Sequence, residues 1–272
     1  MKRNILLLLI ISNYSFSQNL NDQITAIEDK LISWRHDIHK NPELSNREFR
    51  TSKVIANHLK NLNIKVIENV AKTGVIGILN GNRPGKVVAL RADMDALPIH
   101  ERNNLEYKSI NTGVMHACGH DTHMAILMAT AEILSKNRNF PGTVKFIFQP
   151  AEEGPPKGEE GGARLMIKEG VLNNPDVDAI FGLHISSLLP MNKVYYKPRG
   201  FFASSSGLTI KIKGKQTHGG TPWFGVDQIV ISHQHTKGFG HSIKMPCRDA
   251  AQGVLGNLID DKTVWHINPT GN

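Results

Sequence analysis

One short stretch of the chain, Met115 to His123, concentrates the residue types that bind first-row transition metals. Its sequence is MHACGHDTH, and it leads directly into a helical pattern. Zinc and its neighbours prefer thiolate and imidazole ligands, and Cys118 and His120 lie on one tight glycine-containing turn, so both can point into one pocket. We therefore interpret this stretch as half of a metal site.

The other half of the site is expected further along the chain, because a lone Cys-x-His pattern has little specificity. Glu152 and Glu153 follow an apolar run at 144–148, and His184 lies near the end of the next predicted strand. Adjacent glutamates are often no more than a solvated turn, but here they stand between a strand and a Gly/Pro-rich loop, which favours burial. One carboxylate could ligate a metal while the other moves a proton, as metal-assisted hydrolysis requires.

The elements that must position these residues alternate between helical and strand patterns. Apolar residues at 24–38 recur at helical spacing, and Asn41-Pro42 ends that helix. Ser45 and Glu48 form a capping-box pattern before a second helix, with Phe49, Ile55, Leu59 and Leu62 facing inward. Strand patterns follow at 64–67, 75–79, 87–92, 143–148 and 179–185, with helical patterns at 124–134 and 163–168.

This alternation predicts an α/β fold in which helices cover both faces of a mostly parallel sheet, as a three-layer domain. In such folds, functional residues lie just past the carboxyl ends of the strands. Asp93 and Asp95 follow the strand pattern at 87–92, which places them at the same edge as Glu152, Glu153 and His184.

Composition and charge narrow the protein class. The chain has 272 residues, 40% hydrophobic and 21% charged, which is ordinary for a globular protein. Its formal charge of +8 is scattered rather than clustered, so we do not expect a nucleic-acid partner. Residues 1–17 have a basic start, a short apolar run and a polar end, which predicts a cleaved signal peptide and export to the periplasm or outside the cell.

The apolar run of the leader is shorter than the ~20 residues that a spanning helix needs, so a membrane anchor is the weaker interpretation. We expect no membrane association after cleavage. The two cysteines, Cys118 and Cys247, are expected to stay unpaired, because a disulfide would remove the thiolate that the metal site needs.

Five motifs together resemble the amidohydrolase branch of the metal-dependent aminoacylase and carboxypeptidase family, the M20-type peptidases. That branch includes hippurate hydrolases, auxin-conjugate amidohydrolases and N-acetyl-diaminopimelate deacetylases. The resemblance runs from about Ile24 to about Val230. The motifs lie at 91–98 (RADMDALP), 116–123 (HACGHDTH), 149–154 (QPAEEG), 182–184 (GLH) and 213–220 (KGKQTHGG).

The resemblance implies a hydrolase with two divalent metal ions, zinc, manganese or cobalt, that cleaves N-acyl amino acids or short peptides. It implies that Glu152 is the general base, that Asp95 steadies a ligand histidine, and that His218 reaches the substrate from a lid domain, across a homodimer. The implied metal ligands are Cys118, His120, Glu153 and His184.

The remaining polar residues near the cluster receive plainer interpretations. His116 and His123 are expected to pack or to support the ligands rather than to bind metal. Asp93 and Asp121 are either supporting groups of the same kind or turn residues. The helical histidines His36, His39 and His58 are expected to be solvated or structural.

The domain organisation is expected to be a catalytic part at 18–189 and the start of an α+β lid, the dimerisation domain, at 190–230. The lid contains a strand pattern at 208–213. Residues 231–272 show no sustained period, which suggests a disordered tail or a disrupted reading frame rather than a divergent end. The lid would then be incomplete, and the homodimer expected of the family is doubtful for this chain.

Three functions remain open from the sequence. The RADMD segment favours an N-acyl amino acid amidohydrolase over a metallo-carboxypeptidase or dipeptidase. A third interpretation is an inactive remnant that still binds metal or a partner. The sequence does not distinguish the preferred acyl group, the amino acid or the native metal.

Overall fold

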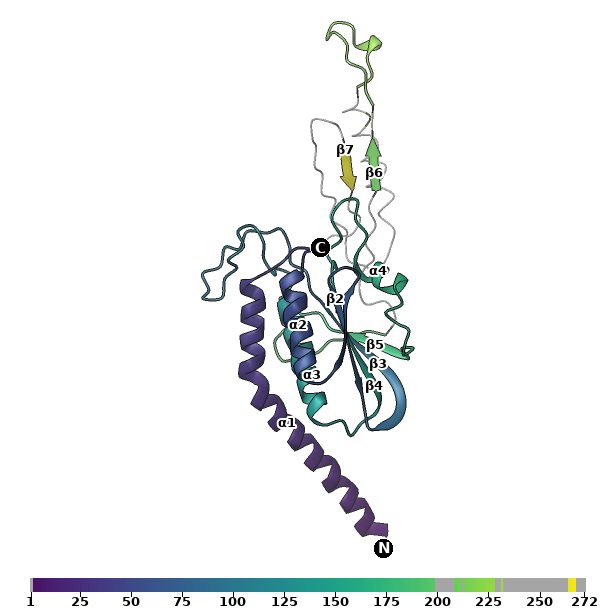
Figure 1. Ribbon diagram of the computed structural model, residues 1–272. Helices are drawn as coiled ribbons and strands as arrows, with labels where there is room; N and C mark the ends of the chain where they lie inside the picture. The colour runs from purple at the N-terminus through teal and green to yellow at the C-terminus, as the bar shows by residue number, and fades with distance from the viewer. Residues whose placement is uncertain (1, 199–207, 212, 228–230, 232–263, 268–272) are drawn as a thin grey trace. The chain divides into compact units, whose positions relative to one another are not determined.

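A computed structural model of the chain describes residues 2–198, 208–211, 213–227, 231 and 264–267 (Figure 1). The chain divides into two units, Met1–Leu189 and Pro190–Asn272. Among the described helices, none combines the length and the apolar character that crossing a bilayer requires. The first helix begins at Lys2 and so includes the proposed leader, whose cleavage stays a prediction.

The first unit is built on a five-stranded sheet in the order β1-β2-β4-β3-β5. Strand β2 pairs antiparallel with β1 and with β4, whereas β3 pairs parallel with β4 and with β5, so β2 alone runs against the other four. This confirms the predicted α/β class with a mostly parallel sheet. The strands are β1 Lys65–Val70, β2 Gly74–Asn80, β3 Arg83–Asp93, β4 Pro141–Gln149 and β5 Ala179–Gly182.

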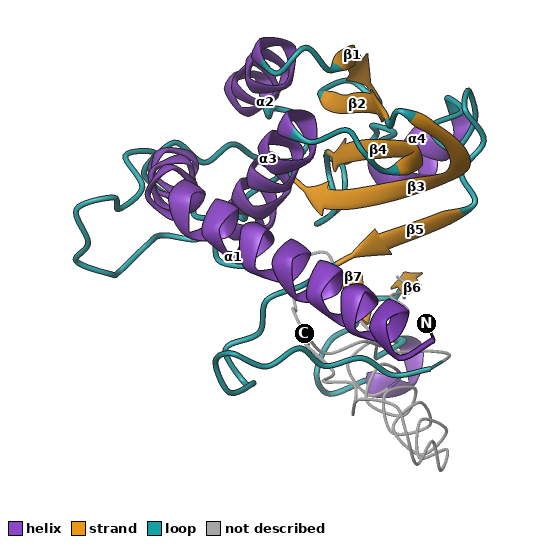
Figure 2. Cartoon of the chain, turned by 90° about the horizontal axis from the view of Figure 1, so that it is seen from below, coloured by secondary structure: helices purple, strands orange, loops and turns teal. Residues whose placement is uncertain are grey.

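Helices cover both faces of this sheet. Figure 2 shows α1, α2 and α3 on one side of the strands and α4 on the other. Their bounds are α1 Lys2–Lys40, α2 Phe49–Asn61, α3 His120–Lys136 and α4 Gly162–Lys168.

Alternating side chains of the central strand β4 supply both cores. Phe146 and Phe148 pack with residues of α1, α2 and α3, whereas Ile147 packs with Met166 of α4. Since successive residues of a strand face opposite sides, one strand can serve two layers. Burying each such side chain contributes about 1.5–3 kcal/mol, so the two cores fix the sheet that carries the candidate site.

The start of α2 differs from the predicted capping box. The side chains of Ser45 and Glu48 make no cap there: Ser45 donates to Asp95, and Glu48 is buried against Thr73. The first-turn amides of α2 instead donate to the carboxylate of Glu43, at 3.0 and 2.8 Å. The local spacing favours a capping box, but both side chains form tertiary hydrogen bonds instead.

One predicted inward-facing position is also wrong, and one strand is shorter than predicted. Phe49 is 57% exposed, although Ile55 and Leu59 are buried as predicted. Strand β5 ends at Gly182 rather than at residue 185, so the segment that carries the next motif has left the sheet.

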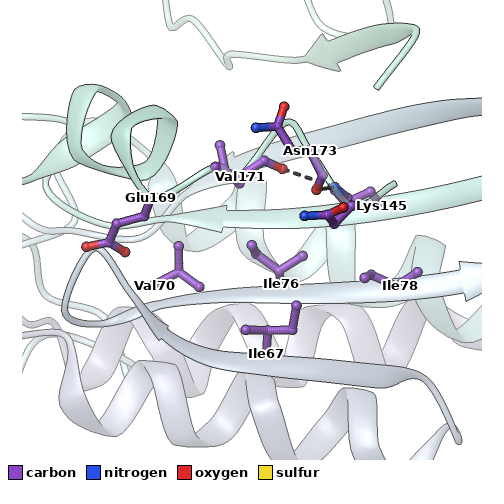
Figure 3. Close-up of a pocket in the computed structure, with 10 residues that line it drawn as sticks. Ile67, Val70, Ile76, Ile78, Lys145, Glu169, Val171 and Asn173 are labelled. Atoms are coloured by element: carbon purple, nitrogen blue, oxygen red, sulfur yellow. Dashed lines mark hydrogen bonds between the residues drawn. The ribbon is translucent and has the colours of Figure 1, made fainter. Parts of the chain in front are cut away.

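The sheet face beneath α4 contains a small hollow of about 210 Å³ (Figure 3). Isoleucine and valine side chains of β1 and β2 form its floor, and Lys145 of β4 lies at its margin. The Lys145 side chain is buried, and its ammonium donates to the carbonyl oxygens of Val171, Asn173 and Pro175 at 3.1, 2.8 and 2.9 Å. These bonds use all three protons of the ammonium and tie the segment after α4 to the sheet.

The second unit contains a two-stranded antiparallel sheet of β6 Leu208–Lys211 and β7 Val264–Ile267. Residues 264–267 belong to the tail for which the sequence suggests disorder or a disrupted reading frame, and here they pair with the predicted lid strand. A short 3-10 helix, η1, spans Pro222–Phe224. Apart from Ile231, the rest of the tail, including Cys247, lies outside the described residues.

Candidate metal centre

Three parallel strands bring their carboxyl ends to one edge of the sheet. Asp93 at the end of β3 pairs with Gln149 at the end of β4, and Arg91 pairs with Gly182 at the end of β5. The segments that follow these strands carry Asp95, the two glutamates and His184. The expected gathering of these residues therefore has a direct cause in the strand register.

Asp95 is buried and organises the loop after β4. Its carboxylate accepts hydrogen bonds from the backbone amides of Glu152 and Glu153, both at 2.9 Å, and from the Ser45 hydroxyl at 2.6 Å. Burial alone would raise the pKa of Asp95, but its hydrogen bonds with His120, Ser45 and the two amides outweigh burial and hold the pKa below its usual value. The ionised carboxylate thus fixes the direction in which the glutamate pair leaves the sheet.

His120 lies at the first position of α3 and is fully buried. Its Nδ1 donates to the Asp95 carbonyl oxygen at 2.7 Å, which leaves the lone pair on Nε2. Nε2 lies 3.6 Å from a Glu152 oxygen and 3.8 Å from a Glu153 oxygen, and it has no hydrogen-bond partner among the described residues.

The field around His120 favours positive charge. Burial lowers its pKa, but polar interactions with the Asp95 and Cys118 side chains and the charges of Asp93 and Asp95 outweigh burial and raise the pKa to about 11. A site that favours a proton this strongly also favours a metal cation at the same lone pair.

Cys118 and His184 lie close to each other and to His120. The Cys118 sulfur lies 3.3 Å from His184 Nε2, while His184 Nδ1 donates to the Ile185 carbonyl oxygen at 2.5 Å. The ligand-capable atoms of Cys118, His120 and His184 all lie within 4.8 Å of one another. Gly119 has a φ of +89°, and a Cβ there would lie 2.4 Å from the Ile185 side chain, so glycine permits this close approach.

His123 and Asp93 lie beside these groups but are already engaged. His123 Nδ1 is 2.6 Å from Asp93 Oδ1, and its Nε2 accepts from the Ile185 amide at 3.0 Å. Asp93 also accepts from Arg91 at 2.6 Å. Burial raises the pKa of Asp93, but His123, His120 and Arg91 outweigh it and hold the pKa well below its usual value.

Helix α1 contacts the site through His39, which hydrogen-bonds with Asp121, the residue after His120. His39 lies between Asp121 and Glu101, with ring nitrogens 2.9 and 3.2 Å from their oxygens. Of the two roles expected for the helical histidines, solvated or structural, His39 has the structural one. His116 is also buried, which lowers its pKa to about 4, and neither ring nitrogen has a hydrogen-bond partner among the described residues.

The two glutamates differ in their surroundings. The Glu152 side chain is 37% exposed and that of Glu153 is 20% exposed. Burial raises the pKa of Glu152, the positive charge of His120 lowers it, and the charges of Asp93 and Glu153 raise it, with a net increase. A carboxylate with a raised pKa that still meets solvent is suited to exchange protons.

Six of the seven site residues inferred from the sequence converge in the first unit. His218 belongs to the second unit, where it is exposed and its Nδ1 accepts from the Gly220 amide. The sequence reasoning missed Ser45 and the Ile185 amide, because neither belongs to a residue type or a spacing that marks a metal site. The six that converge are Asp95, Cys118, His120, Glu152, Glu153 and His184.

The residues present fit a transition-metal ion. The donor set combines sulfur, imidazole nitrogen and carboxylate oxygen, which suits zinc and its neighbours. Both candidate ligand histidines donate Nδ1–H to a backbone carbonyl, the arrangement that orients imidazole ligands. The buried, unpartnered Nε2 of His120 is then explained by a cation.

Comparisons with known proteins agree with this site. Thermostable carboxypeptidase 2 of Saccharolobus solfataricus is 47% identical over 219 residues, covering 80% of this chain and 54% of that protein. The hippurate hydrolase of Campylobacter jejuni is 41% identical over 211 residues, covering 78% and 54%. This chain thus spans about half the length of these relatives.

A solved structure and a family model extend the comparison. The Bacillus subtilis YXEP protein, a dinuclear metal-binding peptidase of family M20, superposes with a TM-score of 0.56 at 46% identity, over 61% of this chain and 45% of that one. The model of peptidase family M20/M25/M40 matches residues 89–269, beyond Val230, where we expected the resemblance to end. The chain therefore belongs to peptidase family M20/M25/M40.

Proposed function

We propose that this chain forms the metal-binding part of a hydrolase that cleaves the amide bond of an N-acyl amino acid. The observation that carries the proposal is the convergence of thiolate, imidazole and carboxylate groups around the buried Nε2 of His120. The Campylobacter relative is a hippurate hydrolase, and hippurate is itself an N-acyl amino acid. Because the chain spans about half of its relatives, the activity of the whole protein is part of the proposal.

The proposed ligands are Cys118, His120, Glu153 and His184. Two divalent cations, zinc, manganese or cobalt, would supply the Lewis acidity that makes water acidic and polarises the scissile carbonyl. The dinuclear YXEP protein supports the number of ions. The mixed sulfur, nitrogen and oxygen donors leave the choice among these three metals open.

Glu152 is the proposed general base. It takes a proton from water and returns it to the leaving amine, for which its raised pKa and its access to solvent are suited. Asp95 holds the Glu152 amide and the His120 imidazole through its carboxylate and carbonyl, so it positions the base and one ligand together.

Three further parts of the proposal rest on the sequence alone. The first two are that His218 contacts the substrate's carbonyl oxygen or carboxylate, and that it does so from the lid of a neighbouring subunit in a homodimer. The third is that residues 1–17 are a signal peptide that exports the chain. The size of the purified protein tests the homodimer, and the N-terminus of the mature chain tests the signal peptide.

A metallo-carboxypeptidase is the second candidate function. It is favoured by the 47% identity to a thermostable carboxypeptidase. N-acetyl and N-benzoyl amino acids assayed beside dipeptides and N-blocked dipeptides distinguish the two functions. Absence of turnover on every substrate by a metal-loaded chain would favour the inactive remnant instead.

Glutamine substitutions of the two glutamates test the assigned roles. Glu152→Gln is expected to retain metal and to lose about 10²–10⁴-fold in hydrolysis, because it lacks the proton-transferring group. Glu153→Gln and Cys118→Ser are expected to lower metal content, measured by elemental analysis of the purified protein. Glu160→Gln, a change at a 70% exposed carboxylate, is the control and should alter neither quantity.

The outcomes separate the parts of the proposal. Loss of metal in Glu152→Gln with retention in Glu153→Gln would reverse the roles of the two glutamates. Full metal content in the Cys118→Ser and Glu153→Gln variants would remove both residues from the ligand set.

A further inference from the structure

His123 has both ring nitrogens committed, and their partners fix its tautomer. A backbone amide can only donate, so His123 Nε2 must carry a lone pair toward Ile185 N at 3.0 Å. Nδ1 therefore carries the proton and donates to Asp93, which also accepts from Arg91. This tautomer is the reverse of that of His120 and His184, whose Nδ1–H groups are satisfied and whose Nε2 atoms face the candidate ligands.

His184 lies on a segment that needs an anchor. Strand β5 ends at Gly182, and His184 itself is exposed. The next residue, Ile185, donates its amide to His123 of the buried helix α3 and places its side chain against Gly119. These contacts bring His184 Nε2 to 3.3 Å from Cys118.

We propose that His123 is the positioning residue for His184: Arg91 and Asp93 orient its ring, and its Nε2 holds the Ile185 amide so that His184 faces Cys118. This inference rests on the metal site proposed above and adds to it a role for His123. It also explains why a metal-site motif contains a histidine beyond those that serve as ligands.

The competing role for His123 is a direct metal ligand, since its ring nitrogen lies within 4.8 Å of atoms of Asp93 and His120. A metal at Nε2 would displace the Ile185 amide, and a metal at Nδ1 would replace the proton that His123 donates to Asp93. Either change breaks one of the two hydrogen bonds of the ring, and a buried polar group left without its partner costs about 1–3 kcal/mol. The positioning role keeps both bonds.

Cobalt titration of the purified full chain tests the inference, with Co²⁺ as the probe. The readouts are the dissociation constant and the thiolate-to-cobalt absorption band of Cys118. His123→Asn can still donate to Asp93 but is too short to reach the Ile185 amide, so we expect about 10- to 100-fold weaker binding. His123→Gln places an amide oxygen near the former Nε2 and is expected to recover much of the affinity.

A double-mutant cycle with His184 distinguishes positioning from direct ligation. If His123 acts through His184, adding His123→Asn to His184→Ala should weaken cobalt binding little further. If His123 were itself a ligand, its loss would add to that of His184. His58→Gln is the control: His58 is a partly buried helical histidine with one hydrogen bond to the Met128 carbonyl, and its variant should bind as the wild type does.

The possible results separate the positioning role of His123 from the metal site itself. A folded His123→Asn chain that binds cobalt as the wild type does would overturn the positioning role and leave the metal site standing. If His123→Asn does not fold, the glutamine variant decides, and folded protein with the affinity of His184→Ala would overturn the role. A wild-type chain that binds no cobalt would overturn the metal site and the positioning role together.

Discussion

At the scale of single residues, the site depends on histidines whose roles differ although their residue type is the same. His120 and His184 direct Nε2 toward the other candidate ligands, His123 uses Nε2 as an acceptor, and His39 lies between two carboxylates. The partner of each ring sets its role. Because those partners come from distant segments, the spacing of the histidines does not reveal these differences.

The buried His39 should make stability depend on pH. The hydrogen bond to Asp121 raises its pKa, burial opposes this, and Glu101 adds to the increase above 6.5. A group with a raised folded pKa stabilises fully below its unfolded value, and that contribution is lost as pH rises through the folded value. We expect His39→Gln to lower the free energy of unfolding by about 1.5–3 kcal/mol at pH 6 and by less at pH 9.

Urea denaturation of the wild type and of His39→Gln at pH 6 and pH 9 measures the loss in the free energy of unfolding at each pH. His36→Gln is the control: His36 lies on the same helix as His39 and its ring stacks on Tyr107, so its variant should lose less stability at pH 6. An equal loss for His39→Gln at pH 6 and pH 9 would contradict the assigned charge.

At the scale of elements, the strand ends bring the site together and a loop carboxylate begins α2. Glu43 accepts the amides of Arg50 and Thr51, which have no partner within the helix. Ser45, which the sequence pattern assigned to that task, supports Asp95 instead. One short segment thus starts a helix and supports the candidate metal centre with different side chains.

Substitutions at Glu43 and Ser45 should therefore have different effects. Glu43→Ala is expected to cost about 0.5–2 kcal/mol of stability, as loss of a helix cap does, and Glu43→Gln should cost less because it keeps an acceptor. Ser45→Ala should instead weaken metal binding through Asp95. Thermal denaturation and cobalt titration of the three variants provide the comparison, and a loss of metal affinity confined to Glu43→Ala would refute this division of roles.

At the scale of the whole first unit, a buried lysine on the sheet face beneath α4 holds the segment that leads into β5. Lys145 binds the segment 171–175, which leads into β5 and so toward His184. Its ammonium is buried without a carboxylate at hydrogen-bonding distance among the described residues, and burial lowers its pKa. The three carbonyl oxygens are the groups that satisfy it.

Lys145→Met should destabilise the fold by at least about 1–3 kcal/mol, because it keeps the apolar stem but leaves three carbonyls without a donor. Lys86→Met is the matched control: the Lys86 side chain is 82% exposed beside Asp178, and an exposed ion pair contributes about 0–1 kcal/mol. Urea denaturation measures both. Equal losses in the two variants would show that the carbonyl contacts of Lys145 do not stabilise the fold.

The sequence by itself determined which residues could bind a metal and which edge of the sheet would carry them. The reason is that both are local: Cys118 and His120 share one turn, and Asp95, the two glutamates and His184 each follow an apolar run. Apolar runs predict strands because burial drives them, and the ends of parallel strands meet at one edge. The α/β class follows from the same pattern.

Only the tertiary structure decided which polar group serves which partner. Three hydrogen-bonded contacts join segments that are distant in sequence: Ser45 with Asp95, Ile185 with His123, and Lys145 with the carbonyl oxygens after α4. A hydrogen bond depends on atoms within about 3 Å and on their direction, and periodicity carries no information about either. Where such a pairing is buried, as for Ser45 with Asp95 and for Lys145, leaving a polar group unsatisfied costs more than the local sequence preference that the pairing overrides.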